Sequence, residues 1–288
     1  MKTPSWTIGN VHVGQVVESV TALPVDAVFP AGTPQKVDKH RDWLRPHFID
    51  GDGQLLMTIR SILIESDGKK IVVDTCMGNE PPAAFAVGAV PGTQYLDDLA
   101  AAGFDRESVD YVLCTHLHVD HVGWNTMRTA SGRQATFPHA RYLFTEPAVA
   151  AWRDQDPTEI AAHGDREAIQ PLLDAGLVDP VPLNHRITDS VRLISTPGHT
   201  RGHVSVLIDS EGQQALVTGD MTHHPVQWAE THWGQATDVD VTVSTATRRR
   251  ILDDYADTDV LIIGTHYAGP AAGKLTRNNG GRFIPLAQ

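Results

Sequence analysis

The sequence predicts an α/β protein, and three observations carry that prediction. Short apolar runs with the composition of β-strands alternate with segments of helical spacing from about residue 55 onward. The chain has 288 residues, which is within the range of one large domain with one or two cores. Histidine and aspartate follow several strands directly, where open α/β sheets bind their ligands. We therefore expect a single domain over residues 55–288, preceded by an arm over residues 1–54.

The arm contains short β-like pieces separated by prolines. Alternation of apolar and polar residues over 11–17 is typical of a strand. Residues 26–47 read as an extended stretch with a short helix near 39–44. An arm of this kind must pack on its own domain or on a second subunit, so a homodimer is one expectation from this segment.

After the arm, the strand and helix signals are stronger. Two apolar runs flank a turn at 66–69 and predict a β-hairpin of strands 56–64 and 70–74. Further strands are expected at 109–115, 141–144, 191–195, 203–208, 215–218 and 260–263. Helices are expected at 95–103, 147–152, 165–175 and 244–256.

The charge balance argues against a nucleic-acid partner. The chain has 23 Lys and Arg against 35 Asp and Glu, a net charge of −12, so it lacks the basic field that phosphate backbones require. Three arginines at 248–250 lie in the last predicted helix near Asp253 and Asp254, and we interpret them as a solvated helix face with pairs four residues apart. We therefore expect a small-molecule substrate.

The apolar stretches argue against a membrane partner. The longest weakly apolar one, 83–90, is well below the length that spans a bilayer. Residues 1–6 lack the apolar core of a secretory signal, so we expect a cytoplasmic protein. Cys76 and Cys114 are too few for a disulfide scaffold and are interpreted as buried packing.

Metal-capable side chains follow four of the predicted strands. They are His116, His118, Asp120, His121, His199, Asp220 and His266. Imidazole nitrogen and carboxylate oxygen suit zinc and related divalent ions, and a site without thiolate is typical of catalysis. These donors are too many for one tetrahedral ion. We therefore expect two divalent ions, zinc in the first place, with Mn, Co or Fe as alternatives.

The spacing predicts how the donors divide. Residues 116 and 118 point the same way from an extended segment, and the chain then turns into a helix that carries residues 120 and 121 toward a neighbouring position. One ion is expected to take His116, His118 and His199. The second is expected to take Asp120, His121 and His266, with Asp220 as the bridge between the two.

These motifs resemble those of the metallo-β-lactamase-fold hydrolases. The resemblance rests on His116-Leu117-His118-Val119-Asp120-His121, Gly198-His199, Gly219-Asp220, Gly264-Thr265-His266 and Val73-Asp74-Thr75, and it covers roughly residues 55 to 270. It implies a four-layer αβ/βα sandwich with the dinuclear site at one edge. Asp220 argues against the best-known β-lactamases, which have Cys there. The arm and the segments 74–79 and 218–223 are more similar to the branch with N-acyl-homoserine lactonases and methyl parathion hydrolase.

The resemblance implies hydrolysis of a small neutral ester, lactone or phosphotriester by a hydroxide that bridges the two ions. Asp120 is expected to hold this nucleophile and later to transfer its proton. Lactonases of this kind have a tyrosine three residues after the bridging aspartate, and this chain has His223 there. His223 either donates a hydrogen bond to the oxyanion or leaving group or has no catalytic role. His203 and His224 are either partners of the metal ligands or packing residues.

Three aromatic residues are candidates for the wall of the substrate pocket, with core packing as the alternative for each. They are Phe85, Trp228 and Tyr267.

Other functions remain open. One is an iron-dependent oxygen-using enzyme of the same fold, although a mononuclear iron site would not need Asp120, His121 and His266 together. Another is β-lactam hydrolysis as a minor activity. A third is a metal-stabilised binding protein without catalysis. The complete set of donors favours the hydrolase.

Overall fold

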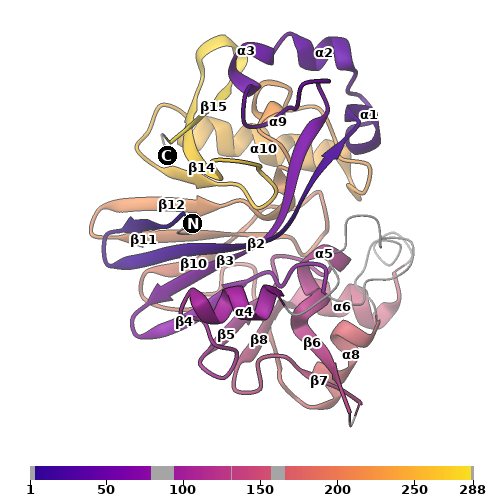
Figure 1. Ribbon diagram of the computed structural model, residues 1–288, viewed down its shortest axis with the longest axis vertical. Helices are drawn as coiled ribbons and strands as arrows, with labels where there is room; N and C mark the ends of the chain where they lie inside the picture. The colour runs from indigo at the N-terminus through magenta and orange to yellow at the C-terminus, as the bar shows by residue number, and fades with distance from the viewer. Residues whose placement is uncertain (1–3, 79–93, 131, 157–165, 287–288) are drawn as a thin grey trace.

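The structure, a computed structural model, describes residues 4–78, 94–130, 132–156 and 166–286. Two β-sheets lie face to face, and helices cover the outer face of each (Figure 1). The layers therefore follow the order αβ/βα, and the predicted fold class is confirmed.

The first sheet has the strand order β1-β2-β3-β4-β5-β8-β9. Its strands are β1 (Trp6–Ile8), β2 (Val11–Leu23), β3 (Leu55–Ser66), β4 (Lys69–Val73), β5 (Tyr111–Leu113), β8 (Arg141–Thr145) and β9 (Val178–Val181). Neighbours from β1 to β4 are antiparallel, and those from β4 to β9 are parallel. A separate antiparallel pair consists of β6 (Thr126–Thr129) and β7 (Gly132–Ala135).

The second sheet has the strand order β10-β11-β12-β13-β14-β15. Its strands are β10 (Val191–Ser195), β11 (Val204–Ser210), β12 (Gln213–Val217), β13 (Leu261–Ile263), β14 (Ala272–Thr276) and β15 (Arg282–Pro285). Only the pair of β12 and β13 is parallel among these described neighbours.

The two sheets repeat one plan. In each, an antiparallel hairpin is followed by a strand parallel to its second member: β3, β4 and β5 in the first sheet, and β11, β12 and β13 in the second. Parallel neighbours end at the same edge of a sheet, so the residues that follow them meet there. This edge carries the candidate site. The predicted hairpin of residues 56–74 is confirmed as β3 and β4.

The helices are α1 (Val25–Val28), α2 (Pro34–Asp38), α3 (Arg41–Leu44), α4 (Gln94–Ala101), α5 (Val119–Val122), α6 (Glu146–Asp154), α8 (Arg166–Asp174), α9 (Val226–Ala229) and α10 (Val241–Tyr255). Short 3-10 turns occur at η2 (Gly123–Asn125), η3 (Gly219–Met221) and η4 (Asn278–Gly280). The start of α10 is fixed by Asp240, whose carboxylate accepts the backbone N–H groups of Thr242 and Val243. Thr145 caps α6 in the same way through Ala148.

Three buried clusters hold the layers together. Between the sheets, Ile62 and Ile71 of the first meet Val206 and Ile263 of the second. A second cluster joins the first sheet to α4, α6 and α8, and a third joins the second sheet to α9, α10 and the arm. Burial of apolar side chains at about 25 cal/mol per Å² is the main term that stabilises such layers.

The arm packs on its own sandwich. Strand β2 is longer than the predicted 11–17 and pairs with β3 from His12↔Glu65 to Leu23↔Leu55, with a bulge between Val17 and Ser19. After β2, Val28 and Phe29 enter the same cluster as Trp228 of α9. Residues that precede the expected domain therefore complete one of its sheets and cover the other.

The interpretation of residues 248–250 as a solvated face is wrong for Arg248. Its side chain is fully buried on the inner face of α10. Arg250 does lie on the exposed face, where its Nη1 is 3.9 Å from Asp254 Oδ2. The spacing alone could not separate these cases, because consecutive helical residues point 100° apart and one of three can face the core.

His224 joins α9 to the arm and predicts how stability changes with pH. Its Nε2 donates to the Phe48 carbonyl at 2.7 Å, and its Nδ1 accepts the Val226 N–H at 3.2 Å, so the buried ring is neutral. Burial lowers the pKa of His224 from 6.5 to about 4. Between these pH values the unfolded chain binds more protons, so acidification favours unfolding. Between pH 7 and pH 5 this residue should cost the folded state about 2 kcal/mol.

The variant His224→Gln should therefore show a shallower loss of unfolding free energy between pH 7 and pH 5 than the wild type. Urea unfolding at the two pH values measures this difference. His139→Gln is the matched control, because His139 is exposed. If the free energy of unfolding of His224→Gln changed with pH as steeply as that of the wild type, His224 would not be the source of the pH dependence.

Candidate metal centre

Four strands position the metal-capable side chains at one edge of the sandwich. His116 and His118 follow β5, and α5 then carries Asp120 and His121. The other three residues follow strands of the second sheet: His199 after β10, Asp220 in η3 after β12, and His266 after β13. All the predicted donors therefore reach one place.

The donors form two groups that share Asp220. The first group is His116, His118, His199 and Asp220, and the second group is Asp120, His121, Asp220 and His266. Within each group, one ligand atom from every residue lies within 4.8 Å of the others. This division is the one predicted from the spacing.

The first group is compact and buried. His199 Nε2 lies 3.2 Å from His116 Nε2 and 2.9 Å from His118 Nδ1. Asp220 Oδ2 lies 3.4 Å from His199 Nε2 and 3.7 Å from His116 Nε2. Three imidazole nitrogens and one carboxylate oxygen thus face a common point.

The second group is similar but includes one more accessible carboxylate. His266 Nε2 lies 3.3 Å from His121 Nε2, and these atoms lie 3.0 Å and 3.2 Å from the oxygens of Asp220. Asp120 Oδ2 is 3.6 Å from both nitrogens. Its side chain is 25% exposed, whereas that of Asp220 is 3% exposed. Asp120 is therefore the carboxylate that reaches solvent.

Three of the donor histidines have their Nδ1 atoms engaged outside the two groups. His121 Nδ1 faces Asp74 Oδ2 at 2.8 Å, His199 Nδ1 faces Asp238 Oδ1 at 2.9 Å, and His266 Nδ1 donates to the Thr58 carbonyl at 2.8 Å. These contacts fix each ring and its tautomer. When these three rings are neutral, their Nε2 atoms carry the lone pairs that can bind a cation.

The facing imidazole nitrogens of each group are suited to bind a cation. Lone pairs of neutral imidazoles 3.2–3.3 Å apart repel one another unless a positive charge lies between them. Burial would lower the pKa of His121, but the carboxylates of Asp220, Asp120 and Asp74 raise it well above its usual value. Imidazole and carboxylate donors without thiolate suit zinc and related divalent ions.

Asp74 and Asp238 contact histidines of the two groups, and the sequence did not assign either residue to the site. Asp74 belongs to a segment noted only for its resemblance. It also accepts the backbone N–H of Thr115 at 2.7 Å and the Thr115 hydroxyl at 2.9 Å, so it orders the segment that leads into the histidines. Asp238 precedes α10 and had no motif to identify it.

His203 contacts the backbone of Asp220, the donor shared by both groups. Its Nε2 accepts the backbone N–H of Asp220 at 2.7 Å, and its Nδ1 donates to the Thr196 carbonyl at 3.0 Å. The approach requires Gly219, because a Cβ at that position would lie 2.6 Å from His203 Nε2. Gly219 also has a φ of +54°, which favours glycine. His203 thus holds the turn that presents Asp220.

His223 lies against both groups. Its Nε2 is 3.1 Å from Asp220 Oδ2, and its ring stacks on His266 with centroids 5.5 Å apart. Burial lowers the pKa of His223 and outweighs the opposite effect of Asp220. The ring is therefore a neutral hydrogen-bonding group on the wall of the site cavity.

A cavity of about 380 Å³ opens onto the donors. One side consists of His118, Asp120, Asp220, His223 and His266. The apolar side comes mainly from the arm and β3: Leu23, Ala27, Val28, Met57 and Ile59, with Met77 and Val119. Of the described residues that line it, none is Lys or Arg. The cavity suits a neutral, partly apolar molecule.

Two of the three predicted aromatic wall residues, Trp228 and Tyr267, do not line this cavity. Trp228 and Tyr267 are fully buried, and Trp228 Nε1 donates to Tyr267 Oη at 2.7 Å. Tyr267 Oη also lies 2.6 Å from Thr222 Oγ1, so this pair supports the residue before His223 from behind. Their polar atoms find partners in the core, which explains why they do not face the cavity. Phe85 lies outside the described residues.

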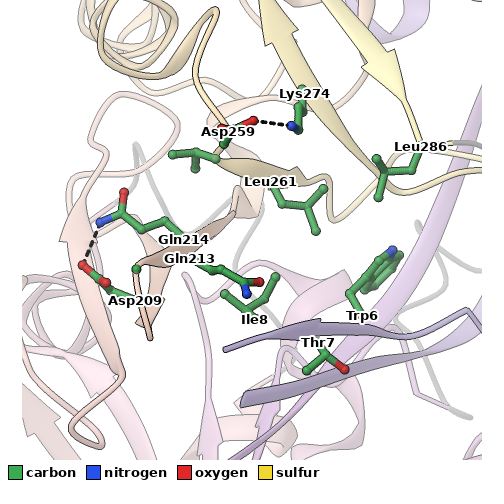
Figure 2. A pocket seen from close by; sticks show the side chains of 12 residues that line it. Trp6, Thr7, Ile8, Asp209, Gln213, Gln214, Asp259, Leu261, Lys274 and Leu286 are labelled. Carbon is green, nitrogen blue, oxygen red and sulfur yellow. Dashed lines mark hydrogen bonds and ion pairs between the residues drawn. The ribbon is translucent and has the colours of Figure 1, made fainter. Parts of the chain in front are cut away.

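A larger hollow of about 720 Å³ lies at the opposite edge, near the amino ends of β12 and β13 (Figure 2). Its charged groups already have partners: Lys274 Nζ is 2.6 Å from Asp259 Oδ1, and Asp209 Oδ2 accepts from Gln214 Nε2 at 2.7 Å. No imidazole lines it among the described residues. The cavity of about 380 Å³, which the donor histidines and aspartates line, is therefore the candidate active site.

The chain is similar in sequence to curated N-acyl homoserine lactonases. An N-acyl homoserine lactonase of Bacillus sp is 26% identical over 172 residues, which are 55% of this chain and 62% of the relative's own length. A Bacillus thuringiensis N-acyl homoserine lactonase is 26% identical over 188 residues, covering 59% of this chain and 67% of its own. The chain thus spans about three fifths to two thirds of the length of these relatives.

Solved structures share the fold over nearly the whole chain. The dizinc quorum-quenching lactonase AidC, in complex with a product, has a TM-score of 0.80 at 21% identity and covers 99% of this chain and 98% of its own. The hydrolase AbOPH of the beta lactamase superfamily has a TM-score of 0.81 at 22% identity, with the same coverage.

Within the described ranges, no helix has the length and apolar character needed to cross a bilayer. The profile of the Metallo-beta-lactamase superfamily matches residues 57–266, which include every donor of the two groups. On this match and the arrangement of its donors, the chain belongs to the metallo-beta-lactamase superfamily.

Proposed function

We propose that the protein is a dinuclear metal-dependent hydrolase that cleaves a small neutral ester, with lactones as the leading class. One observation carries this proposal: two groups of donors share Asp220 and open onto a partly apolar cavity without Lys or Arg among its described lining residues. The lactonase relatives support the same class. Phosphotriesters are the second class, because they are also neutral and have an electrophilic centre bonded to oxygen.

The residues of the chain divide the chemical work. Two divalent ions held by the groups would supply a water of lowered pKa and polarise the bond to be cleaved. Asp120 is placed to accept a proton from the attacking water and to return it to the leaving oxygen, because its carboxylate lies at the cavity and reaches solvent. His223 lines the cavity with its Nε2 3.1 Å from Asp220 Oδ2, and its Nε2–H would donate a hydrogen bond to the oxygen that gains negative charge.

The cavity wall explains why the substrate should be neutral and partly apolar. A charged substrate group would lose its hydration there without gaining an opposite charge from Lys or Arg among the described lining residues. Leu23, Val28 and Met57 instead offer apolar surface to an acyl or aryl group. Larger or anionic substrates are therefore expected to be poor.

The role of His223 can be tested directly. His223→Phe should lower kcat by roughly 10²- to 10³-fold, because the loss of one oxyanion donor has an effect of that size. Metal content should stay at the wild-type level, since the two groups do not include His223. The measurements are steady-state kinetics and metal analysis, and the exposed His139→Phe is the control. Wild-type kcat in His223→Phe would remove His223 from catalysis.

The substrate class is tested by a panel assayed with the metal-reconstituted protein. The panel consists of N-acyl lactones of different chain length, aryl esters, phosphotriesters and a β-lactam. The proposal expects the highest kcat/KM on lactones or aryl esters with apolar groups. Absence of turnover on the whole panel with zinc, manganese, cobalt or iron would overturn it.

A further inference from the structure

One face of α10 contacts the loops that hold the first group. Thr247 Oγ1 donates to the Pro197 carbonyl at 2.7 Å, and Ser244 Oγ donates to Asp238 Oδ2 at 2.6 Å. Arg248 completes this face one turn after Ser244. Ser244, Thr247 and Arg248 of α10 therefore face the candidate metal centre.

Asp238 connects this face to a metal ligand. Its Oδ1 lies 2.9 Å from His199 Nδ1, and both side chains are fully buried. Its Oδ2 accepts from Ser244 Oγ and from the backbone N–H of Gln235 at 3.1 Å. With both oxygens held, the carboxylate cannot rotate away. His199 must keep its proton on Nδ1, and its Nε2 faces the other two histidines of the first group.

Arg248 is the counter-charge of Asp238. Its Nη1 lies 3.6 Å from Asp238 Oδ2 and donates to the Met221 carbonyl at 3.1 Å. Its Nε donates to the Thr231 carbonyl at 2.8 Å, and its Nη2 donates to Ser244 Oγ at 3.1 Å. A buried guanidinium persists only with acceptors and an opposite charge of this kind. Because Met221 follows Asp220, the same side chain also holds the turn of the shared carboxylate.

We propose that Asp238 and Arg248 are positioning residues that set the affinity of the first group for its metal ion. The proposal rests on the proposed function, because it presumes that the two groups bind metal. The second group meets this face only through the shared Asp220, because His121 and His266 take their Nδ1 partners from Asp74 and Thr58. Loss of Asp238 or Arg248 should therefore weaken one ion more than the other.

The test is a Zn²⁺ titration of the metal-free full chain against a competing chromophoric chelator, which resolves two affinities. The wild type should bind two ions. In Asp238→Ala and Asp238→Asn, one affinity should fall about 10- to 100-fold, as expected for a ligand that loses its partner, and the other should stay unchanged. Arg248→Met also loses the contact to the Met221 carbonyl beside the shared Asp220, so there the same affinity should fall more than the other. Asp253→Asn and Arg249→Met are matched controls on the exposed face of α10 and should leave both affinities unchanged.

The outcomes separate this proposal from the proposed function. A wild type that binds no Zn²⁺ overturns both. A wild type that binds two ions, with unchanged affinities in the Asp238 variants, overturns the positioning role alone. Equal weakening of both ions, together with a lower unfolding temperature of the metal-free chain, shows a merely structural role and also overturns it. If Arg248→Met does not fold, the nearly isosteric Asp238→Asn gives the decision.

Discussion

Replacement of Asp220 by asparagine is expected to release metal and to lower hydrolysis by about 10³-fold or more, which corresponds to roughly 4 kcal/mol of lost transition-state stabilisation. Asp220 is the only residue common to both groups of described donors. Its two oxygens lie within 3.4 Å of four imidazole nitrogens, including that of His223. Burial would raise the pKa of Asp220, but the surrounding histidines hold it well below its usual value. The side chain is thus a buried anion at the centre of the site.

An asparagine keeps the shape of Asp220 but supplies no negative charge. The expected result is fewer than two bound ions per chain after dialysis, with the loss of turnover following the loss of metal. Metal analysis and steady-state kinetics measure both quantities on one preparation. Asp253→Asn, on the exposed face of α10, changes the same charge without contact to the site and should have no effect. If Asp220→Asn still bound two ions and turned over substrate at the wild-type rate, Asp220 would not be the carboxylate that bridges them.

Replacement of Asp120 by asparagine is expected to lower kcat by roughly 10²- to 10⁴-fold, the range found when a general acid–base group is lost. Asp120 differs from Asp220 because its carboxylate lies at the edge of the cavity, 3.6 Å from His121 Nε2 and His266 Nε2. It can therefore exchange a proton with substrate and solvent. An amide cannot accept that proton.

Asp120→Asn and Asp220→Asn should differ in how much metal they retain. Asp120→Asn should keep the ion of the first group, since Asp120 is not part of that group. Asp220→Asn should weaken both. Kinetics with a substrate that has a good leaving group should recover part of the activity of Asp120→Asn, because protonation of the leaving oxygen then matters less. Equal metal loss in both variants would argue against separate roles.

The sequence predicted the donors because their signal is local. Each follows an apolar strand, and parallel strands bring their carboxyl ends to one edge of a sheet whatever the rest of the chain does. The separation of His116 from His118 by one residue, followed by a helix, also determines which ring faces which ion. The donors of each sheet were therefore predictable from local signals, whereas the sandwich that joins the two sheets was implied by the family resemblance.

The supporting residues required the tertiary structure. Asp238 meets His199 because α10 packs on the loop after β10, and no spacing in the sequence encodes that contact. Trp228 stands near a ligand segment in sequence, yet α9 turns it toward Tyr267. Strand β14, of sequence AGKLT, has little β-propensity and is extended because β13 and β15 pair with it. The cytoplasmic location and the homodimer stay predictions of the sequence.

The most direct test of the central claim is a titration of the metal-free protein with Zn²⁺ while lactone hydrolysis is followed. Two ions should bind per chain, and full turnover should require both, because the donors form two groups around Asp220. Activity that reaches its maximum at one ion per chain, or that persists in the metal-free protein, would contradict it.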